Sequence, residues 1–179
     1  MDVYFLLAAW CSYPHPAKKE KTGIDGLPPA TQEGKGTFGC LVNGLLFTPK
    51  GSPFGGPIQQ SYYQFVNGVN YFLVSGTNNS NSSKVYSIKI RSEDVILQTG
   101  MTIPLIEGEK GKASGLYWVG EVASTNEYKT DGHNKGELKI TRFDEANQIV
   151  SGTFWFDAVN DKGVKVEVRE GRFDMRFTK

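Results

Sequence analysis

The chain has 179 residues, which suits one domain with a short extension, and its 20 Lys and Arg residues nearly balance its 19 Asp and Glu residues. A formal net charge of +1 provides no basic surface of the kind that binds nucleic acid, so no nucleic-acid partner is expected. The 11 Phe, 8 Tyr and 21 Gly residues favour strands and turns over helices.

The N-terminal residues 1–11 resemble the end of a bacterial lipoprotein signal. An apolar run, Val3–Ala9, is too short to span a bilayer and leads to Cys11. In such signals a cysteine after small residues accepts the lipid, and we interpret Cys11 as that acceptor. Asp2 and Trp10 depart from the pattern, which has a basic and a small residue at these places. The alternative is an unmodified N-terminus.

Residues 12–36 are rich in Pro, Gly and Lys and show neither a strand period nor a helix period. Such a composition is typical of a flexible tether, here between the anchor and a domain at 37–179. Cys40 is the only other cysteine in the chain. The sequence leaves open whether Cys11 and Cys40 form a disulfide.

Turn signals divide the domain into short strands. Asn-Gly pairs at 43–44 and 67–68 separate apolar runs, which predicts two type I′ hairpins. Residues 160–163 predict a turn closed by a left-handed Gly163. Alternating runs at 164–169 and 172–178 predict a hairpin about Glu170 and Gly171, with Val168 opposite Phe173. Further strands are expected at 85–91, 94–99, 101–105, 115–122, 137–143 and 148–157.

These elements predict an all-β fold of about ten antiparallel strands. Such strands bury one face each by stacking into a sandwich or by closing into a barrel. We favour the antiparallel β-sandwich, with a calycin-like or lipocalin-like barrel as the alternative. A small barrel can enclose one apolar ligand, whereas a sandwich binds with its surface or loops.

Three stretches of this domain resemble one family. They are GTFGCLVNGLLFTPKG at 36–51, TGMTIPL at 99–105, and the block from Gly136 to Asp174 that includes GELKITRFDEANQIVSGTFWFDA and GRFD. The family comprises small predicted lipoproteins of Bacteroidota with a domain of unknown function. The resemblance implies an exported, lipid-anchored, all-β domain in the cell envelope, at the outer membrane or in the periplasm. It implies no activity.

Catalytic and metal sites are not expected. His15 lies in the expected tether and His133 in a predicted loop tip at 131–136. The sequence contains no nucleophile elbow, phosphate loop or zinc motif. We therefore predict no catalytic residue, no metal and no cofactor.

Aromatic side chains are the best candidates for ligand binding: Trp118, Trp155, Tyr62 and Tyr63. In strands, neighbours face opposite sides, so Tyr62 and Tyr63 must separate. A ring on the solvent side could stack on a sugar or a partner. The sequence thus predicts a non-enzymatic, envelope-anchored binding or structural module. Its partners would be a small molecule, a glycan or an envelope protein, and its only membrane contact the lipid anchor. The alternatives are a carrier of an apolar molecule and an unrecognised enzyme.

Overall fold

The computed structural model describes residues 23–109 and 111–179, and within them every regular element except two short 3-10 turns is a strand. The turns are η1 (Gly23–Gly26) and η2 (Pro53–Gly55). The strands are β1 (Thr37–Val42), β2 (Leu45–Phe47), β3 (Gln59–Val66), β4 (Val69–Asn78), β5 (Lys84–Glu93), β6 (Thr102–Leu105), β7 (Ala113–Glu121), β8 (Ser124–Lys129), β9 (Gly136–Asp144), β10 (Ile149–Val159) and β11 (Lys165–Arg176). No helix among the described residues has the length and apolarity that crossing a membrane requires.

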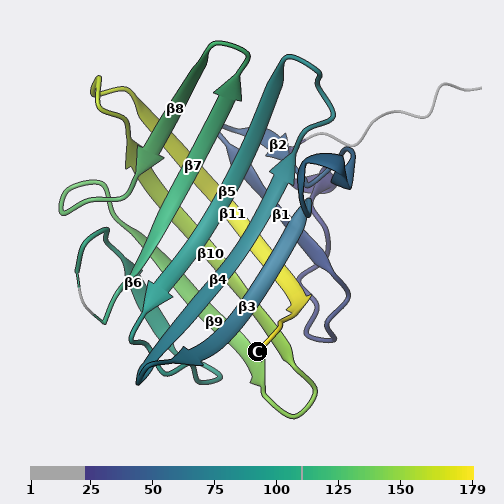
Figure 1. Cartoon of the computed structure of the whole chain (residues 1–179), viewed down its shortest axis with the longest axis vertical. Coiled ribbons are helices and arrows are strands. Elements are labelled where there is room, and N and C mark those ends of the chain that lie inside the picture. Colours follow the sequence, from purple (N-terminus) through teal and green to yellow (C-terminus); the bar gives the residue numbers. More distant parts are fainter. Residues whose placement is uncertain (1–22, 110) are drawn as a thin grey trace, which may run out of the picture.

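The strands form two layers that cross steeply (Figure 1). The front layer contains β3, β4, β5, β7 and β8, and the back layer contains β1, β11, β10 and β9. β6 pairs with β9 and with β7 and so joins the layers. The hydrogen-bonded path begins at β2 and ends at β3, which is the organisation of a sandwich and not of a closed barrel. The predicted all-β sandwich is therefore confirmed. Its pairings are antiparallel except for the contact between β6 and β7 and two isolated bridges.

Aromatic and branched side chains fill the space between the layers. The largest fully buried ones include Phe38 and Phe72, and Phe38 lies 5.5 Å from Phe154 between ring centroids. Cys40 is also fully buried, and burial raises the pKa of its thiol. These side chains fill the interior between the layers.

The turn chemistry read from the sequence is largely confirmed. Asn43 and Gly44 have φ of 48° and 79°, and Asn67 and Gly68 have φ of 50° and 85°, as type I′ turns require. Gly163 has φ of 77° and closes its turn through a hydrogen bond from its N–H to the Asn160 carbonyl.

The hairpin predicted about Glu170 is wrong. Residues 165–176 form one continuous strand, β11, and Val168 pairs with Phe156 of β10 instead of Phe173. Glu170 has φ of 54° beside a register shift, so it forms a bulge and not a turn. Apolar and polar residues alternate on both sides of such a bulge, and in the sequence this pattern is the same as that of two strands joined by a hairpin turn. Gly171 is needed because a Cβ there would overlap the ring of Phe154.

A second expected strand, at 94–99, is a loop. Asp94 has φ of 61°, which ends β5, and residues 95–99 join no strand. The segment is attached to β9 through the Thr99 hydroxyl, which bonds to the backbone of Phe143. Val95 and Leu97 are nevertheless buried. Val95 and Leu97 alternate with exposed neighbours, which produces the sequence pattern of a strand although this segment pairs with no strand.

Part of the segment expected as a tether is attached to the domain. Residues 12–22 and Cys11 lie outside the described residues, but residues 27–36, here called the N-terminal strap, lie along the back layer. Leu27 is buried, and Gly34 lies against Ile149 and Arg176. Arg142 donates a hydrogen bond to the Gln32 carbonyl.

One carboxylate, that of Asp174, holds the N-terminal strap. Asp174 is fully buried on β11. Its oxygens accept hydrogen bonds from Thr31 Oγ1 at 2.6 Å, Glu33 N at 3.0 Å, Gly34 N at 2.6 Å, Lys35 N at 3.2 Å and Ser151 Oγ at 2.7 Å. Burial opposes ionisation, but these donors prevail and hold the pKa of Asp174 well below its usual range.

We predict that Asp174→Asn lowers the free energy of unfolding at neutral pH by about 2–4 kcal/mol, because an amide cannot accept all five bonds. Since the folded-state pKa is lowered, this contribution is complete above the unfolded value of about 4 and is lost as pH falls below it. Urea denaturation at about pH 7 and about pH 3 measures both effects, so the difference between Asp174→Asn and the wild type should shrink in acid. Asp161→Asn, in an exposed turn, is the control. Equal stability of wild type and Asp174→Asn at both pH values would contradict the role of Asp174.

Candidate functional site

The four aromatic residues singled out from the sequence lie on three different surfaces. Tyr62 and Trp118 are half-buried on the outward face of the front layer. Tyr63 points inward and packs at 5.0 Å from Phe143 between ring centroids. Trp155 is exposed on the outward face of the back layer. Strand alternation therefore places Tyr62 and Tyr63 on opposite faces, as expected. Tyr62 and Trp118 share the outward face of the front layer.

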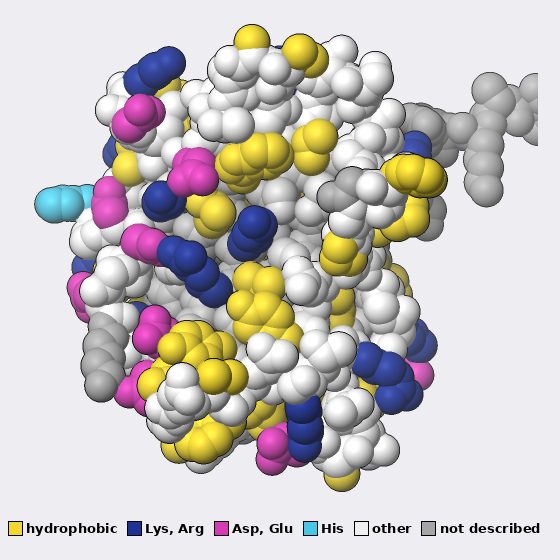
Figure 2. All heavy atoms as spheres, viewed as in Figure 1, with side chains coloured by type: hydrophobic (Ala, Val, Ile, Leu, Met, Phe, Trp, Pro, Cys, Tyr) yellow, Lys and Arg dark blue, Asp and Glu magenta, His cyan; other side chains and the backbone are white. Residues whose placement is uncertain are grey.

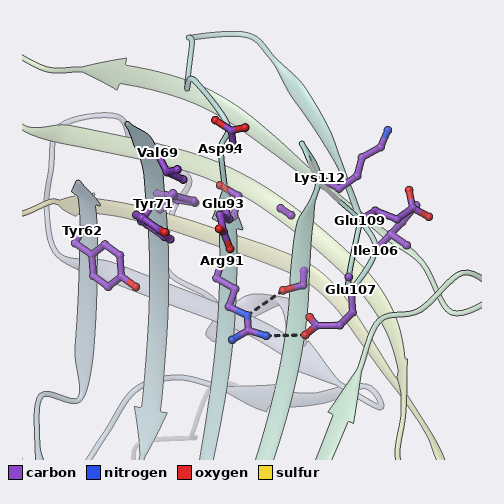
Figure 3. Close-up of a pocket in the computed structure, with 15 residues that line it drawn as sticks. Tyr62, Val69, Tyr71, Arg91, Glu93, Asp94, Ile106, Glu107, Glu109 and Lys112 are labelled. Carbon is purple, nitrogen blue, oxygen red and sulfur yellow. Dashed lines mark hydrogen bonds and ion pairs between the residues drawn. The ribbon is translucent and has the colours of Figure 1, made fainter. Parts of the chain in front are cut away.

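The outward face of the front layer contains an open groove of about 670 Å³, here called the front groove (Figure 3). β3, β4 and β5 form its floor, and the loop between β6 and β7 forms a wall along one side. Its lining includes Tyr62, Tyr71, Arg91, Glu93, Glu107 and Ser114. Trp118 lies farther along the same face and does not line the groove.

Two tyrosines provide the apolar part of the groove. Tyr62 on β3 is paired with Leu73, and Tyr71 lies two residues before Leu73 on β4, so both rings emerge on the outward face. Figure 3 shows the two side chains on adjacent strands at the same side of the groove. Neither residue is fully buried, so both have ring surface that a ligand can contact.

An ion pair lies opposite these rings. Arg91 Nη2 donates to Glu107 Oε1 at 2.6 Å, and Arg91 Nε donates to Ser114 Oγ at 3.3 Å. These bonds connect β5 with the loop before β7, through Glu107, and with β7 itself, through Ser114 (Figure 3). A solvent-exposed pair of this kind contributes little to stability. Its effect here is geometric, because it holds a planar guanidinium and a carboxylate beside the tyrosines.

Behind the floor of the groove lies a buried polar group without a hydrogen-bond partner. Ser92 is only 6% exposed and is aligned with Phe72 and Ala113, whose side chains point between the layers, so its hydroxyl faces the core and not the groove. Among the described residues, only the hydroxyls of Ser61 and Ser92 are buried side-chain polar atoms without a hydrogen-bond partner. An unpaired buried hydroxyl of this kind costs about 1–3 kcal/mol of stability.

The rest of the front face mixes apolar and charged side chains (Figure 2). The ring of Trp118 lies over Gly120, where a Cβ would overlap Trp118 Cη2. Lys129 pairs with Glu127 at 2.9 Å, and the nearby Lys side chain helps to lower the pKa of Glu127. Trp118 thus forms a flat apolar area next to the front groove.

Trp155 has a different environment on the back layer. It is 43% exposed, but the guanidinium carbon of Arg169 lies 5.6 Å from its ring centroid. Arg169 is in turn bonded to Asp157. The hollow around Trp155 has a volume of about 470 Å³. Trp155 is more exposed than Tyr62 or Tyr71, but its ring is already engaged by the chain's own Arg169.

His133 lies in an exposed turn, as the sequence predicts. Asp131 Oδ1 accepts bonds from the N–H groups of His133 at 2.7 Å and Asn134 at 2.6 Å. Hydrogen bonds from Asn134, from its backbone and its side chain, and from the His133 N–H lower the pKa of Asp131. In the described part of the chain, no three His, Cys, Asp or Glu side chains are grouped so that they could hold a metal ion.

Among the side chains that line the front groove, the sequence singled out Tyr62 but not Tyr71, Arg91 or Glu107. Tyr71 and Arg91 could have been found from strand alternation, because both share the outward face with Tyr62. Glu107 lies in a loop, and no local pattern relates it to Arg91, 16 residues earlier.

Comparison with known proteins yields one match. A family model described as "Domain of unknown function (DUF6252)" matches residues 60–175. No curated protein and no solved structure matches the chain.

We predict that Gly120→Ala displaces the ring of Trp118 into water, because the added methyl occupies the place of the ring. The chain contains three tryptophans, so the measurement uses a Trp10→Phe, Trp155→Phe background in which only Trp118 emits. Its fluorescence maximum should then move to longer wavelength. Gly132→Ala is the matched control, since nothing lies within 4 Å of a Cβ at Gly132. An unchanged maximum in Gly120→Ala would show that Trp118 does not rest on Gly120.

Proposed function

The chain belongs to the DUF6252 family, and we propose that this member is a non-enzymatic module that binds a carbohydrate in the front groove. The observation that carries the proposal is the combination of two tyrosine rings with the Arg91–Glu107 pair in one open groove. The predicted partners included a glycan, a small molecule and an envelope protein, and the groove favours the glycan.

The chemistry of a sugar ring matches these groups. A pyranose has an apolar C–H face that packs on an aromatic ring, and hydroxyls at its edge that need donors and acceptors. Tyr62 and Tyr71 supply rings, while Arg91 and Glu107 supply a charged donor and a charged acceptor in fixed positions. Hydrogen bonds to charged groups are stronger than those between neutral groups. The open form of the groove suits a chain that extends beyond one sugar.

Other functions have less support. Glu107 is bonded to Arg91 at 2.6 Å, which suits a fixed binding group better than a proton donor for catalysis. A carrier of an apolar molecule would need free space between the layers. Phe72, Phe156 and Phe177 are fully buried there, so aromatic rings occupy the interior.

We further propose that a lipid on Cys11 anchors this module in a bacterial cell envelope. The sequence Leu7-Ala8-Ala9 before Trp10 and Cys11 supports the anchor, as does the resemblance to predicted lipoproteins of Bacteroidota. A single acylated cysteine would hold the domain at a membrane through its buried methylene groups.

We predict that Tyr62→Ala weakens saccharide binding about ten- to hundredfold, because it removes stacking surface worth about 1.5–3 kcal/mol. Affinity electrophoresis of the full chain in gels with soluble glucan, mannan, xylan or glycol chitin identifies the polymer. Calorimetry with an oligosaccharide of that polymer then gives the dissociation constant.

Two variants control for folding and for position. Tyr62→Phe keeps the ring and should retain most of the affinity. Trp155→Ala removes an exposed ring from the opposite layer and should bind as the wild type does. The proposal fails if no polymer retards the wild type, or if Trp155→Ala loses binding while Tyr62→Ala keeps it.

The anchor has its own test, the intact mass of the mature N-terminus from the native membrane fraction. We predict a chain that begins at an acylated Cys11. In the Cys11→Ala variant the acyl mass should be absent and the protein should leave the membrane fraction. An unmodified chain that retains Met1 in the soluble fraction would overturn the anchoring proposal.

A further inference from the structure

From the position of the exposed apolar side chains we infer that one end of the sandwich rests on a lipid bilayer, with Phe54 and Val122 among the lipid headgroups. This inference rests on the proposed lipid on Cys11. It adds the surface that touches the membrane and the direction in which the front groove faces.

Contacts between distant segments bring η1, β2 and η2 to one end of the molecule, here called the entry end. The turn η1, at residues 23–26, packs against β2. Asn78 Nδ2 donates to the Thr48 carbonyl at 3.1 Å, which fixes the chain after β2 to the end of β4. Asn79 Oδ1 accepts from Ser52 N at 2.9 Å, and Ser52 caps η2, so η2 lies at the same end.

The turn between β7 and β8 also belongs to the entry end (Figure 1). Glu121 at the end of β7 is paired with Lys84 at the start of β5, and their side chains form an ion pair at 2.7 Å. β5 follows the loop that contains Asn79, so residues 122–123 lie at the same end as this loop.

Four large apolar side chains of the entry end are exposed. They are Ile24 in η1, Leu45 in β2, Phe54 in η2 and Val122 in the β7–β8 turn. Phe54 is fully exposed, and Val122 is 92% exposed. Such side chains gain free energy when they leave water, and phenylalanine and leucine are typical of surfaces that lie in the membrane interface.

The length of chain between the proposed anchor and the domain favours a bilayer as the partner of this surface. Residues 12–22 separate Cys11 from Gly23, and a segment of this length spans at most about 40 Å. A lipid on Cys11 would therefore keep the entry end close to the membrane. Three lysines of the segment would add attraction to anionic lipids. They are Lys18, Lys19 and Lys21.

A second set of exposed apolar side chains, Phe65, Val66 and Ile96, lies at the opposite end and lines one hollow there. β4 runs between the two ends, and its 10 residues give it a length of about 33 Å. Contact of this opposite end with lipid would lift Gly23 by about one strand length and would stretch residues 12–22 close to their limit. The entry end can touch the bilayer without such stretching, so the chain length favours the entry end.

The same orientation leaves the front groove accessible. Tyr71 lies near the start of β4, Glu93 ends β5 and Ala113 begins β7, so these lining residues lie toward the end opposite the entry end. A domain that rests on its entry end would present the groove away from the bilayer. A polymer outside the membrane could then reach it.

The test uses the acylated full chain in vesicles of phosphatidylethanolamine and phosphatidylglycerol that contain a lipid with a nitroxide on its acyl chain. A fluorescent dye is attached to the thiol introduced by Phe54→Cys. Cys11 carries the lipid and Cys40 is fully buried, so the introduced thiol is the one that reacts. The nitroxide should remove about half or more of the dye emission, because interfacial side chains lie about 5–10 Å deep. Val122→Cys should behave in the same way.

Phe65→Cys is the matched control, since Phe65 is also an exposed phenylalanine but lies at the opposite end. With the same dye it should lose little emission to the nitroxide. Any tendency of the dye itself to enter lipid would affect both variants equally, so the difference between them reports the orientation of the domain.

The inference and the anchor can fail separately. Equal quenching in Phe54→Cys and Phe65→Cys, or stronger quenching in Phe65→Cys, would overturn the orientation, while an acylated chain in the membrane fraction would still support the anchor. A chain that carries no lipid on Cys11 would overturn the anchor and this inference together. Neither result depends on whether the front groove binds a saccharide.

Discussion

The back layer depends on one buried carboxylate, that of Asp174. A lone charge inside a protein is costly, but here five donors surround it, and three of them are backbone N–H groups of the N-terminal strap. The N-terminal strap and the Asp174 carboxylate depend on each other. The N-terminal strap needs the carboxylate to satisfy its N–H groups, and the carboxylate needs the strap to exclude water. β11, which carries Asp174, also pairs with β1 and β10.

The front groove results from the same strand geometry applied to the other layer. Alternation sends Phe72, Val74 and Ile90 into the core, and it necessarily sends Tyr71 and Arg91 outward. The loop after β6 then supplies Glu107, which fixes Arg91 in place. Strand alternation therefore both fills the core and orients the side chains of the front groove. The loop after β6 is the one addition to the sheet that the groove requires.

Features that depend on a few neighbouring residues could be predicted from the sequence. Features that depend on contacts between distant segments could not. The Asn-Gly turns were predictable because the left-handed conformation of Asn43 and Asn67 is a property of the turn itself. The bulge at Glu170 was not, because only the strands on either side of β11 distinguish a bulge from a hairpin. Asp174 gave no local signal of its role, since its partners at 31–35 lie about 140 residues away. The Arg91–Glu107 pair escaped detection for the same reason.

The attachment of the N-terminal strap has a mechanical consequence. Residues 31–35 are bonded to Asp174 before the chain enters β1 at Thr37, and β1 is itself paired along β11. Tension applied to the N-terminus is therefore borne first by the hydrogen bonds around Asp174. Any remaining force is transmitted along β1 as shear against β11, across several bonds at once. The front layer lies outside this load path, so a domain pulled by its N-terminus would keep the shape of its groove.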